Sequence, residues 1–333
     1  MRKRKFCIGL IVLFAFLAPV MTGAVEPPYG VLNGREKPRI IVSTDIGGSD
    51  PDDFQSMVHL LVYADIFNIE GLISSPPYEG RKEAILEVID AYEKDYSNLS
   101  SYSDAYPTPG ELHSISYQGA IEVQEDATPS FNISEGAQHI IDRAKAGKEK
   151  PLYILVWGSI TDVAQAVHED PSIKERIRVY SIGSWNTRQD PKARDYLYNN
   201  HSDLWWIENN TTFRGMYMGG YQEGNYGNQT FVSAHVRDHG SLGELYCNKK
   251  RKIKMGDTPS VLYMLTGDPS DPASESWGGR FRPLGHGPNY WTDRRENRLR
   301  VGNKDGAKTV NKWRINYLEH WEKRMDRAQE PNK

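Results

Sequence analysis

The chain has 333 residues, and its 44 Asp and Glu residues slightly outnumber its 41 Lys and Arg residues, for a formal net charge of −3. Charges of both signs are interleaved except near the C-terminal end, so the composition excludes a nucleic acid polymer as the expected partner. A chain of this length can bury a large core, as one α/β domain or as two smaller ones.

The first 24 residues have the pattern of a secretory signal peptide. Four basic residues, 2–5, precede an apolar stretch over residues 6–20, and small residues at 22–24 offer a cleavage site. An uncleaved membrane anchor is the alternative, but the apolar stretch is short for a hydrocarbon core of ~30 Å. We therefore expect a periplasmic or secreted bacterial protein without stable membrane insertion. Its mature chain would keep one cysteine, Cys247, and no internal disulfide.

Strand and helix patterns alternate along the first two thirds of the chain. The expected strands are residues 40–43, 68–74, 152–157, 177–182 and 204–207. The expected helices are residues 53–64, 81–96, 134–146 (with Ser134 as N-cap), 161–168, 241–247, 258–265 and 311–327. Residues 97–128 are polar and predict an irregular loop over the site, and residues 215–227 are rich in Gly, Tyr and Asn.

Strands that are separated by helices pair in parallel through right-handed crossovers. The sequence therefore predicts an α/β fold, with an open, mainly parallel sheet flanked by helices. We expect residues 25–333 to form a single domain with long loops and a C-terminal helix.

Acidic residues gather where the first expected strand meets the first expected helix. Asp45 ends the strand, a Gly-rich turn follows, and Asp52 and Asp53 open the helix. Open α/β sheets bind their ligands at this edge. Crowded carboxylates repel one another unless a cation neutralises them, and hard oxygen ligands favour Ca²⁺ or Mg²⁺ over zinc. The competing interpretation is that Asp52 and Asp53 only cap the helix.

The same residues carry a resemblance to a known family. The run Thr44 to Gly47, together with Asp52 and Asp53, resembles the N-terminal fingerprint of the nucleoside hydrolases. Residues 158–162, 182–184 and 256–259 agree with that family in order and spacing. Residues 46–48, 70–72, 212–216 and 276–281 resemble more closely the nucleoside-hydrolase-like domain of some cellulose-binding bacterial proteins. The resemblance covers residues 39–291 and implies a Rossmann-like core.

The resemblance also implies a set of site residues. The expected ligands of Ca²⁺ are Asp45, Asp52 or Asp53, Asp257 and the main-chain carbonyl of Trp157. Asp45 would also be the catalytic general base. The candidates for substrate binding are Asn186, Asn200 and Glu208. This constellation suits hydrolysis of a glycosidic bond through an oxocarbenium-like transition state, which carboxylates stabilise.

Three departures from the family pattern bear on the substrate. The first Asp of the usual motif is Ser43, the turn contains the additional Asp50, and the His before the late Asp is Gly256. The missing His argues against ordinary nucleosides. We therefore expect an exported, calcium-dependent glycosyl hydrolase that cleaves an N- or O-glycosidic bond in carbohydrate degradation. The alternatives are a non-catalytic carbohydrate-binding protein on the same fold and a periplasmic ribonucleoside hydrolase.

The remaining candidates lie in loop segments. Aromatic residues there either stack on sugar rings or bury the loops, and both interpretations stay open. These residues are Trp185, Trp205, Trp206, Trp277, Tyr290 and Trp291. His235, His239 and His286 have no spacing partner for zinc and are expected in solvated loops. The expected partner is a small-molecule or oligosaccharide glycoside, and the chain is a candidate homo-oligomer.

Overall fold

The computed structural model describes residues 36–48, 50–77, 81–123, 133–147 and 149–329. Within these ranges, eight strands form one sheet in the order β3-β2-β1-β4-β5-β6-β8-β7. Neighbouring strands are parallel, except for the antiparallel edge pair β7 and β8. The strands are β1 (Arg39–Thr44), β2 (Asn68–Ser74), β3 (Ser116–Gln118), β4 (Leu152–Val156), β5 (Ile177–Ile182), β6 (Trp206–Asn209), β7 (Phe281–Pro283) and β8 (Tyr290–Asp293). The expected signal peptide lies outside the described residues.

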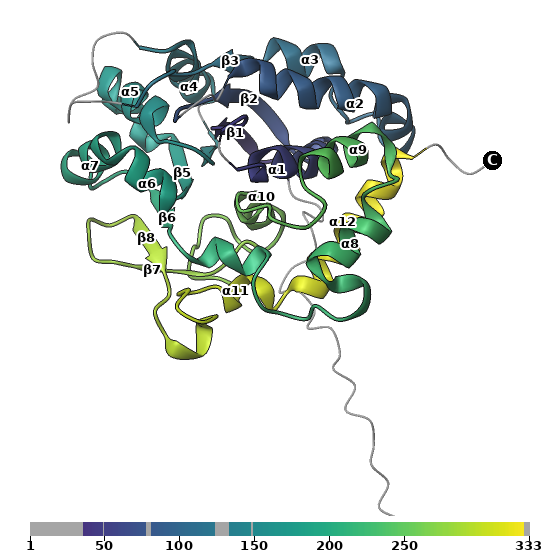
Figure 1. Ribbon diagram of the computed structural model, residues 1–333. Helices are drawn as coiled ribbons and strands as arrows, with labels where there is room; N and C mark the ends of the chain where they lie inside the picture. Colours follow the sequence, from purple (N-terminus) through teal and green to yellow (C-terminus); the bar gives the residue numbers. More distant parts are fainter. Residues whose placement is uncertain (1–35, 49, 78–80, 124–132, 148, 330–333) are drawn as a thin grey trace, which may run out of the picture.

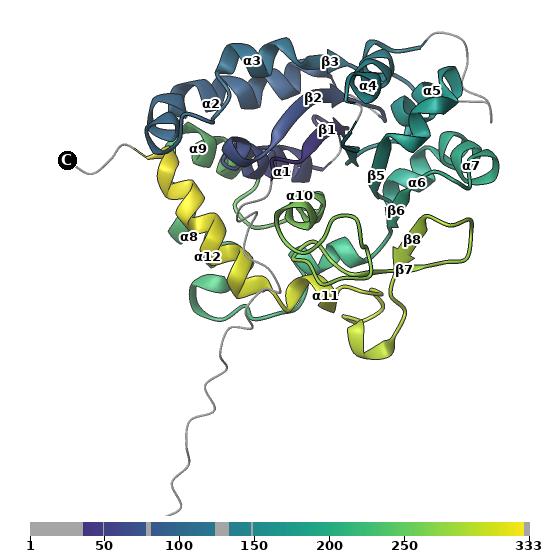
Figure 2. The same ribbon diagram turned by 180° about the vertical axis from the view of Figure 1, so that it is seen from behind.

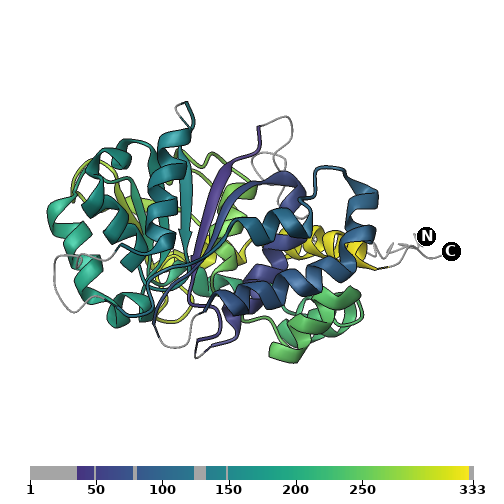
Figure 3. The same ribbon diagram turned by 90° about the horizontal axis from the view of Figure 1, so that it is seen from above.

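Helices cover both faces of the sheet (Figures 1 and 3). One face packs against α4 (Glu135–Ala146), α5 (Thr161–Glu169) and α7 (Pro191–Asn200). The other packs in a larger core with α1 (Asp52–Leu61), α2 (Lys82–Tyr102), α3 (Pro109–Ser114), α8 (Asn228–His235), α9 (Gly240–Lys249), α10 (Thr258–Leu265), α11 (Lys308–Asn311) and α12 (Arg314–Met325). The short helices α6 (Trp185–Gln189) and η3 (Thr212–Met216) follow β5 and β6. Figure 2 shows α12 beside α8 and α9.

The central strand β1 explains why the sequence folds in this way. All six of its residues are buried, between β2 and β4. Ile40 and Val42 pack into the larger core and Ile41 into the smaller one, because successive side chains of a strand point to opposite faces. A parallel strand that is covered on both faces needs such a continuous apolar run.

The mainly parallel sheet with flanking helices confirms the predicted fold class. β2, β5 and α10 have the predicted bounds. Ser134 caps α4 as expected, since its hydroxyl accepts a hydrogen bond from the Ala137 N–H at 2.9 Å. In the part of the chain that the structure describes, no helix is long and apolar enough to cross a bilayer.

The prediction of an irregular segment over residues 97–128 is wrong where helices and a strand form, at residues 97–102, 109–114 and 116–118. Residues 103–108 and 119–123 are irregular as predicted, and residues 124–128 lie outside the described ranges. α2 continues to Tyr102, α3 follows, and β3 extends the sheet beside β2. Thr108 and Glu111 form a reciprocal capping box at the start of α3. The segment is polar because its helices are short and partly exposed, so its hydrophobic pattern is too weak to indicate structure.

Several short elements were not predicted. They are α6, α7, α8, β7 and β8, and β6 begins two residues later than expected. The sequence of α7 is mostly polar, and only three of its ten residues are buried. β7 and β8 have three and four residues, which is too short for an alternating pattern to be distinctive.

Candidate functional site

A cavity of about 340 Å³ opens at the carboxyl ends of the central strands. Its walls come from the residues that follow β1, β4, β5 and β6 and from the start of α10. The lining side chains are mostly acidic, basic and aromatic, together with one amide. They include Asp45, Asp50, Asp52, Asp53, Asp257, Arg188, Arg214, Lys254, Trp157, Trp185, Asn186, Phe213 and Tyr217.

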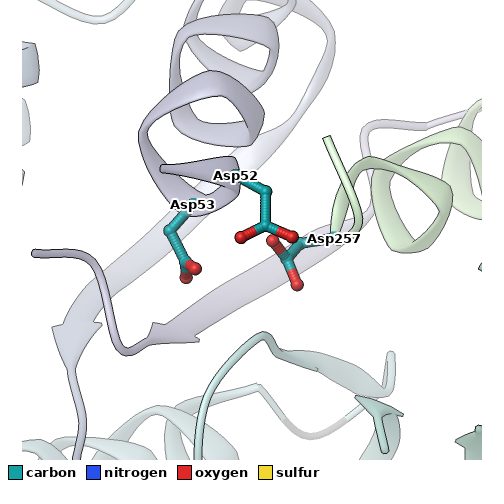
Figure 4. Close-up of side chains that lie close together, drawn as sticks. All are labelled: Asp52, Asp53 and Asp257. Atoms are coloured by element: carbon teal, nitrogen blue, oxygen red, sulfur yellow. The ribbon is translucent and has the colours of Figure 1, made fainter. Parts of the chain in front are cut away.

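Four carboxylates from three elements meet in this cavity. Asp45 follows β1, Asp52 and Asp53 open α1, and Asp257 stands at the N-cap of α10. One oxygen each of Asp52, Asp53 and Asp257 lies within 4.8 Å of the other two. Figure 4 shows these three side chains close together. Asp53 and Asp257 are buried, and Oδ2 of Asp257 has no hydrogen-bond partner. The structure therefore brings the predicted acidic residues together.

The electrostatics of this group are unfavourable without a cation. Burial and, after it, the charge of the neighbouring Asp52 raise the pKa of Asp45 to about 7. Burial and the charge of Asp50 raise the pKa of Asp52 to about 6. The pKa values of Asp53 and Asp257 are raised well above the usual range, first by burial and then by the other carboxylates. Burial and nearby negative charges both disfavour the ionised form of a carboxyl group and therefore raise its pKa.

The donor set fits a hard divalent cation such as Ca²⁺. Carboxylate oxygens converge from several sides, and one buried oxygen of Asp257 lacks any donor. A buried, unpartnered carboxylate oxygen costs free energy that a cation would recover. In the described residues, no His or Cys belongs to this group, so its chemistry favours calcium or magnesium over zinc.

Hydrogen bonds hold the acidic residues in place. The Thr44 hydroxyl donates to Oδ1 of Asp53. Trp157 Nε1 donates to the Ser260 hydroxyl at 2.7 Å, and that hydroxyl donates to the Asp257 carbonyl at 2.7 Å. Gln55 on α1 binds the segment that leads to Asp257. Its amide donates to the carbonyls of residues 250 and 252 and accepts from the N–H groups of residues 254 and 255.

Two glycines lie very close to acidic residues of the site, Gly158 to Asp45 and Gly256 to Asp52. A Cβ at Gly158 would lie 2.7 Å from the Cβ of Asp45. A Cβ at Gly256 would lie 2.6 Å from Oδ2 of Asp52. A larger residue at position 256, such as the His of the family pattern, would therefore displace the Asp52 carboxylate.

The predicted ligand Trp157 and the predicted substrate residue Asn186 are neighbours. Both line the cavity, and Nδ2 of Asn186 donates to the Trp157 carbonyl at 2.5 Å and to the Ile182 carbonyl at 3.1 Å. The Trp157 carbonyl thus faces the site but already accepts one hydrogen bond. Its second lone pair is available to a ligand.

Asn200 and Glu208 are not brought to the carboxylates. Asn200 is the last residue of α7, and its amide donates to the Tyr196 carbonyl at 2.9 Å. The Glu208 carboxylate is held by Arg194 through two hydrogen bonds of 2.9 Å and also by the Tyr290 hydroxyl. Neither residue lines the cavity, so the geometry does not support direct contact with a substrate bound there.

The aromatic and histidine candidates divide clearly. Trp185 lines the cavity and is 46% exposed, whereas Trp205, Trp206, Trp277 and Tyr290 are buried and Trp291 is half-buried. Burial of loops therefore accounts for most of these residues. The expectation of solvated loops is wrong for His235, which lies in α8 and pairs with Glu322 at 3.0 Å, and for His239, which is buried and pairs with Asp326 at 3.2 Å. His286 lies in the loop between β7 and β8 and is partly buried. His286 stacks on Tyr198 with a centroid distance of 3.6 Å.

Sequence reasoning did not single out the basic side of the cavity. Lys254 binds Asp50 at 2.5 Å and lies 4.0 Å from Asp52. Arg188 and Arg214 come from short elements after β5 and β6. The sequence patterns around Lys254 and Arg188 do not mark them as site residues. Arg214 lies in the run 212–216, whose family resemblance was the one signal available for it.

The mainly parallel sheet, with acidic residues at its carboxyl edge, has the arrangement that the resemblance to a nucleoside hydrolase-like domain implies. Residues 39–281 match the family model described as cellulose-binding Sde182, nucleoside hydrolase-like domain, and the chain belongs to this family. Every residue that lines the cavity lies within the matched range. No curated protein matches the chain.

Solved structures agree with this assignment. The chain is similar to a nucleoside hydrolase-related hypothetical protein from Saccharophagus degradans that is associated with carbohydrate metabolism. The identity is 27%, the match covers 89% of this chain and 73% of that chain, and the TM-score is 0.70. A purine-preferring ribonucleoside hydrolase from Gardnerella vaginalis shares the fold, with 13% identity, coverage of 86% and 99%, and a TM-score of 0.50. The plant nucleoside hydrolase PpNRh1 does so with 14% identity, coverage of 87% and 99%, and a TM-score of 0.51.

Proposed function

We propose that this protein is an exported, calcium-dependent glycosyl hydrolase that acts on a carbohydrate glycoside. The observation that carries the proposal is the group of four carboxylates, Asp45, Asp52, Asp53 and Asp257, in one cavity with raised pKa values. Repulsion between buried carboxylates lowers the stability of the folded protein, so a purely structural role does not explain why they are grouped. A cation site explains the arrangement.

The residues divide the chemistry among them. Asp52, Asp53, Asp257 and the Trp157 carbonyl would hold the cation together with Asp45. Calcium, when bound, supplies positive charge that orients sugar hydroxyls and lowers the pKa of a nearby water. Asp45 accepts the proton of the attacking water as general base. The surrounding carboxylates stabilise the positive charge that develops on the sugar in an oxocarbenium-like transition state.

Two observations favour a carbohydrate over a free nucleoside. Gly256 leaves no side chain at the position where the family pattern has a His, and a Cβ there would collide with Asp52. The family description refers to cellulose binding, and the Saccharophagus degradans protein is associated with carbohydrate metabolism. The N-terminal pattern over residues 1–24 supports export to a compartment where such substrates occur.

The second candidate function is carbohydrate binding without catalysis. It is favoured by Ser43, which replaces the first Asp of the family motif and is buried in β1 with an unpartnered hydroxyl. The family description also supports it. The retention of all four carboxylates argues for the enzyme, because a sugar-binding surface does not need buried, mutually repelling acids.

Calcium binding tests the proposal first. Calorimetry of the calcium-free protein should show one tight site, and Asp45→Asn and Asp257→Ala should abolish it. Asp142→Asn is the matched control, since Asp142 is exposed on α4 at the other face of the sheet. Absent binding in the unmodified protein would refute the metal site.

Hydrolysis is then measured on glycosides and nucleosides, with and without a chelator. Calcium-dependent release of a reducing sugar from a glycoside supports the enzyme. Tight calcium binding and sugar binding without any turnover would favour the binding protein instead. Rapid cleavage of inosine or uridine would contradict the preference for a carbohydrate.

A further inference from the structure

Two arginines in the cavity lack an acidic partner. Arg188 lies on α6 and Arg214 in η3, and both line the space that contains the carboxylates. In the described ranges, neither guanidinium has a carboxylate within the 4.0 Å of a salt bridge. Both charges are therefore available to a ligand.

Arg214 makes weak contacts for a partly buried cation. Its Nη1 donates to the Tyr217 hydroxyl at 3.1 Å, and its Nη2 reaches the Ser184 hydroxyl at 3.4 Å. Its Nε is buried without a hydrogen-bond partner, and the guanidinium lies 4.8 Å from the centroid of the Phe213 ring. A buried N–H without an acceptor costs free energy, which an oxyanion of a ligand would recover.

Lys254 differs from the two arginines. Its ammonium lies 2.5 Å from Asp50 and 4.0 Å from Asp52, so carboxylates of the protein already neutralise it. The cavity thus has an acidic side, where Lys254 belongs, and a basic side made by α6 and η3. A cation bound among the carboxylates would leave the two arginines without partners.

The turn before α6 contains a strained residue, and this turn sets the position of Arg188 on the basic side of the cavity. Ser184 has a φ of 61° and is the one non-glycine residue with positive φ in the described part of the chain. Its N–H donates to Asn210 Oδ1 at 2.9 Å. Strain of this kind is retained where a site needs it. The turn delivers the exposed Trp185 and, 5.5 Å from its ring centroid, the guanidinium of Arg188.

We propose that the cavity binds a glycoside whose sugar carries an oxyanion, a carboxylate or a phosphate group, and that Arg214 and Arg188 bind this group while Trp185 packs against the sugar ring. This inference rests on the proposed function in one respect, because it assumes that a sugar binds beside the carboxylates. Guanidinium groups bind carboxylate and phosphate through paired, charge-assisted hydrogen bonds. An acidic sugar supplies the partner that the two arginines lack, and a neutral sugar does not.

The test is calorimetric titration of the calcium-loaded protein with two matched pairs of probes. The pairs are methyl glucuronoside with methyl glucoside, and ribose 5-phosphate with ribose. We expect one charged probe to bind at least about tenfold more tightly than its neutral counterpart, as a charge-assisted pair allows. Arg214→Gln and Arg188→Gln should each remove this preference and leave the neutral probes unchanged. Arg176→Gln, at the opposite end of β5, is the matched control and should change nothing.

Each outcome decides the proposal. Preference for the glucuronoside identifies the carboxylate, and preference for ribose 5-phosphate identifies the phosphate. Equal affinity for charged and neutral probes, no binding of either charged probe, or a preference that survives both substitutions would overturn the proposal. Arg188 is exposed, so its replacement does not threaten folding. A calcium titration of the same samples tests the hydrolase proposal separately, because lost calcium binding and lost charge preference are distinct results.

Discussion

At position 256, a side chain and the Asp52 carboxylate would compete for the same space. Because Gly256 has no side chain, the Asp52 carboxylate can occupy that space. The replacement of the family's His by Gly is therefore linked to the position of Asp52 in the acidic group. Asp45, next to Gly158 and Gly48, depends on small residues in the same way. Close backbone approach is the reason for glycine at these three positions.

At the scale of the residue, Asp45→Asn should stabilise the calcium-free protein at neutral pH. The pKa of Asp45 is raised to about 7 and that of Asp52 to about 6, whereas both are ~4 in an unfolded chain. The folded state therefore binds more protons between these values, and the free energy of unfolding falls as pH rises from about 4 to about 7. The substitution removes one of these charges and should add about 1–2 kcal/mol at pH 8.

Urea unfolding in a chelator, at pH 5 and at pH 8, measures this effect. At pH 5 the gain should be clearly smaller than at pH 8, because the Asp45 carboxyl is then protonated in the folded state. A part of the gain remains, since the same carboxyl is still ionised in the unfolded chain at pH 5. Added calcium should stabilise the unmodified protein and not the variant. A variant that is less stable than the unmodified protein at pH 8 in chelator would show that the repulsion is absent.

At the scale of the element, α1 carries two functions. Asp52 and Asp53 open it, and Gln55, one turn further, holds the segment that leads to Asp257. The amide of Gln55 uses both its donors and its acceptor oxygen on backbone groups, and the residue is buried. Gln55 thus helps to hold the start of α10 against α1, together with the hydrogen bond from the Thr258 hydroxyl to the Ser56 hydroxyl at 3.1 Å.

Gln55→Met should separate this positioning role from simple packing. Methionine has a similar shape but leaves the N–H groups of residues 254 and 255 without their acceptor, which costs about 2–4 kcal/mol of unfolding free energy. Calcium affinity should fall as well, by about tenfold, because Asp257 is no longer held against Asp52. Calorimetry and urea unfolding give the two quantities. Unchanged calcium affinity in a destabilised variant would leave Gln55 with a structural role alone.

At the scale of the whole molecule, the C-terminal helix completes the larger core. Trp321 on α12 is fully buried against Phe231 of α8, Tyr246 of α9 and His59 of α1. Arg314, at the start of the same helix, is buried and donates to the Met216 carbonyl in η3 at 2.9 Å. α12 lies beyond the range of the family match, yet it supports the element that supplies Arg214.

Trp321→Ala should lower the free energy of unfolding by about 3–5 kcal/mol, because it leaves a large cavity among aromatic rings. Trp185→Ala is the matched control: Trp185 is 46% exposed, and its loss should change stability by less than about 0.5 kcal/mol. Urea unfolding of both variants measures the difference. Similar losses for both tryptophans would mean that α12 does not close the core.

The sequence by itself determined the parallel sheet and the acidic half of the site. The apolar run of β1 and the residues at its end are local, so adjacent residues such as Asp45, Asp52 and Asp53 could be assigned from spacing and family resemblance. Asn186, on the short helix after β5, lines the cavity as well, and its role in substrate binding stays a prediction.

Only the tertiary structure decided the basic half of the cavity and the fate of the other candidates. Arg188 lies on α6 after β5, Arg214 lies in η3 after β6, and Lys254 lies between α9 and α10. The fold brings these separate segments together at one edge of the sheet. Glu208 lies near the carboxyl end of β6, but its carboxylate is bound by Arg194 and not directed to the cavity. The packing of segments that are far apart in the sequence determines which side chains face a cavity. The local hydrophobic periodicity of the sequence does not indicate this packing.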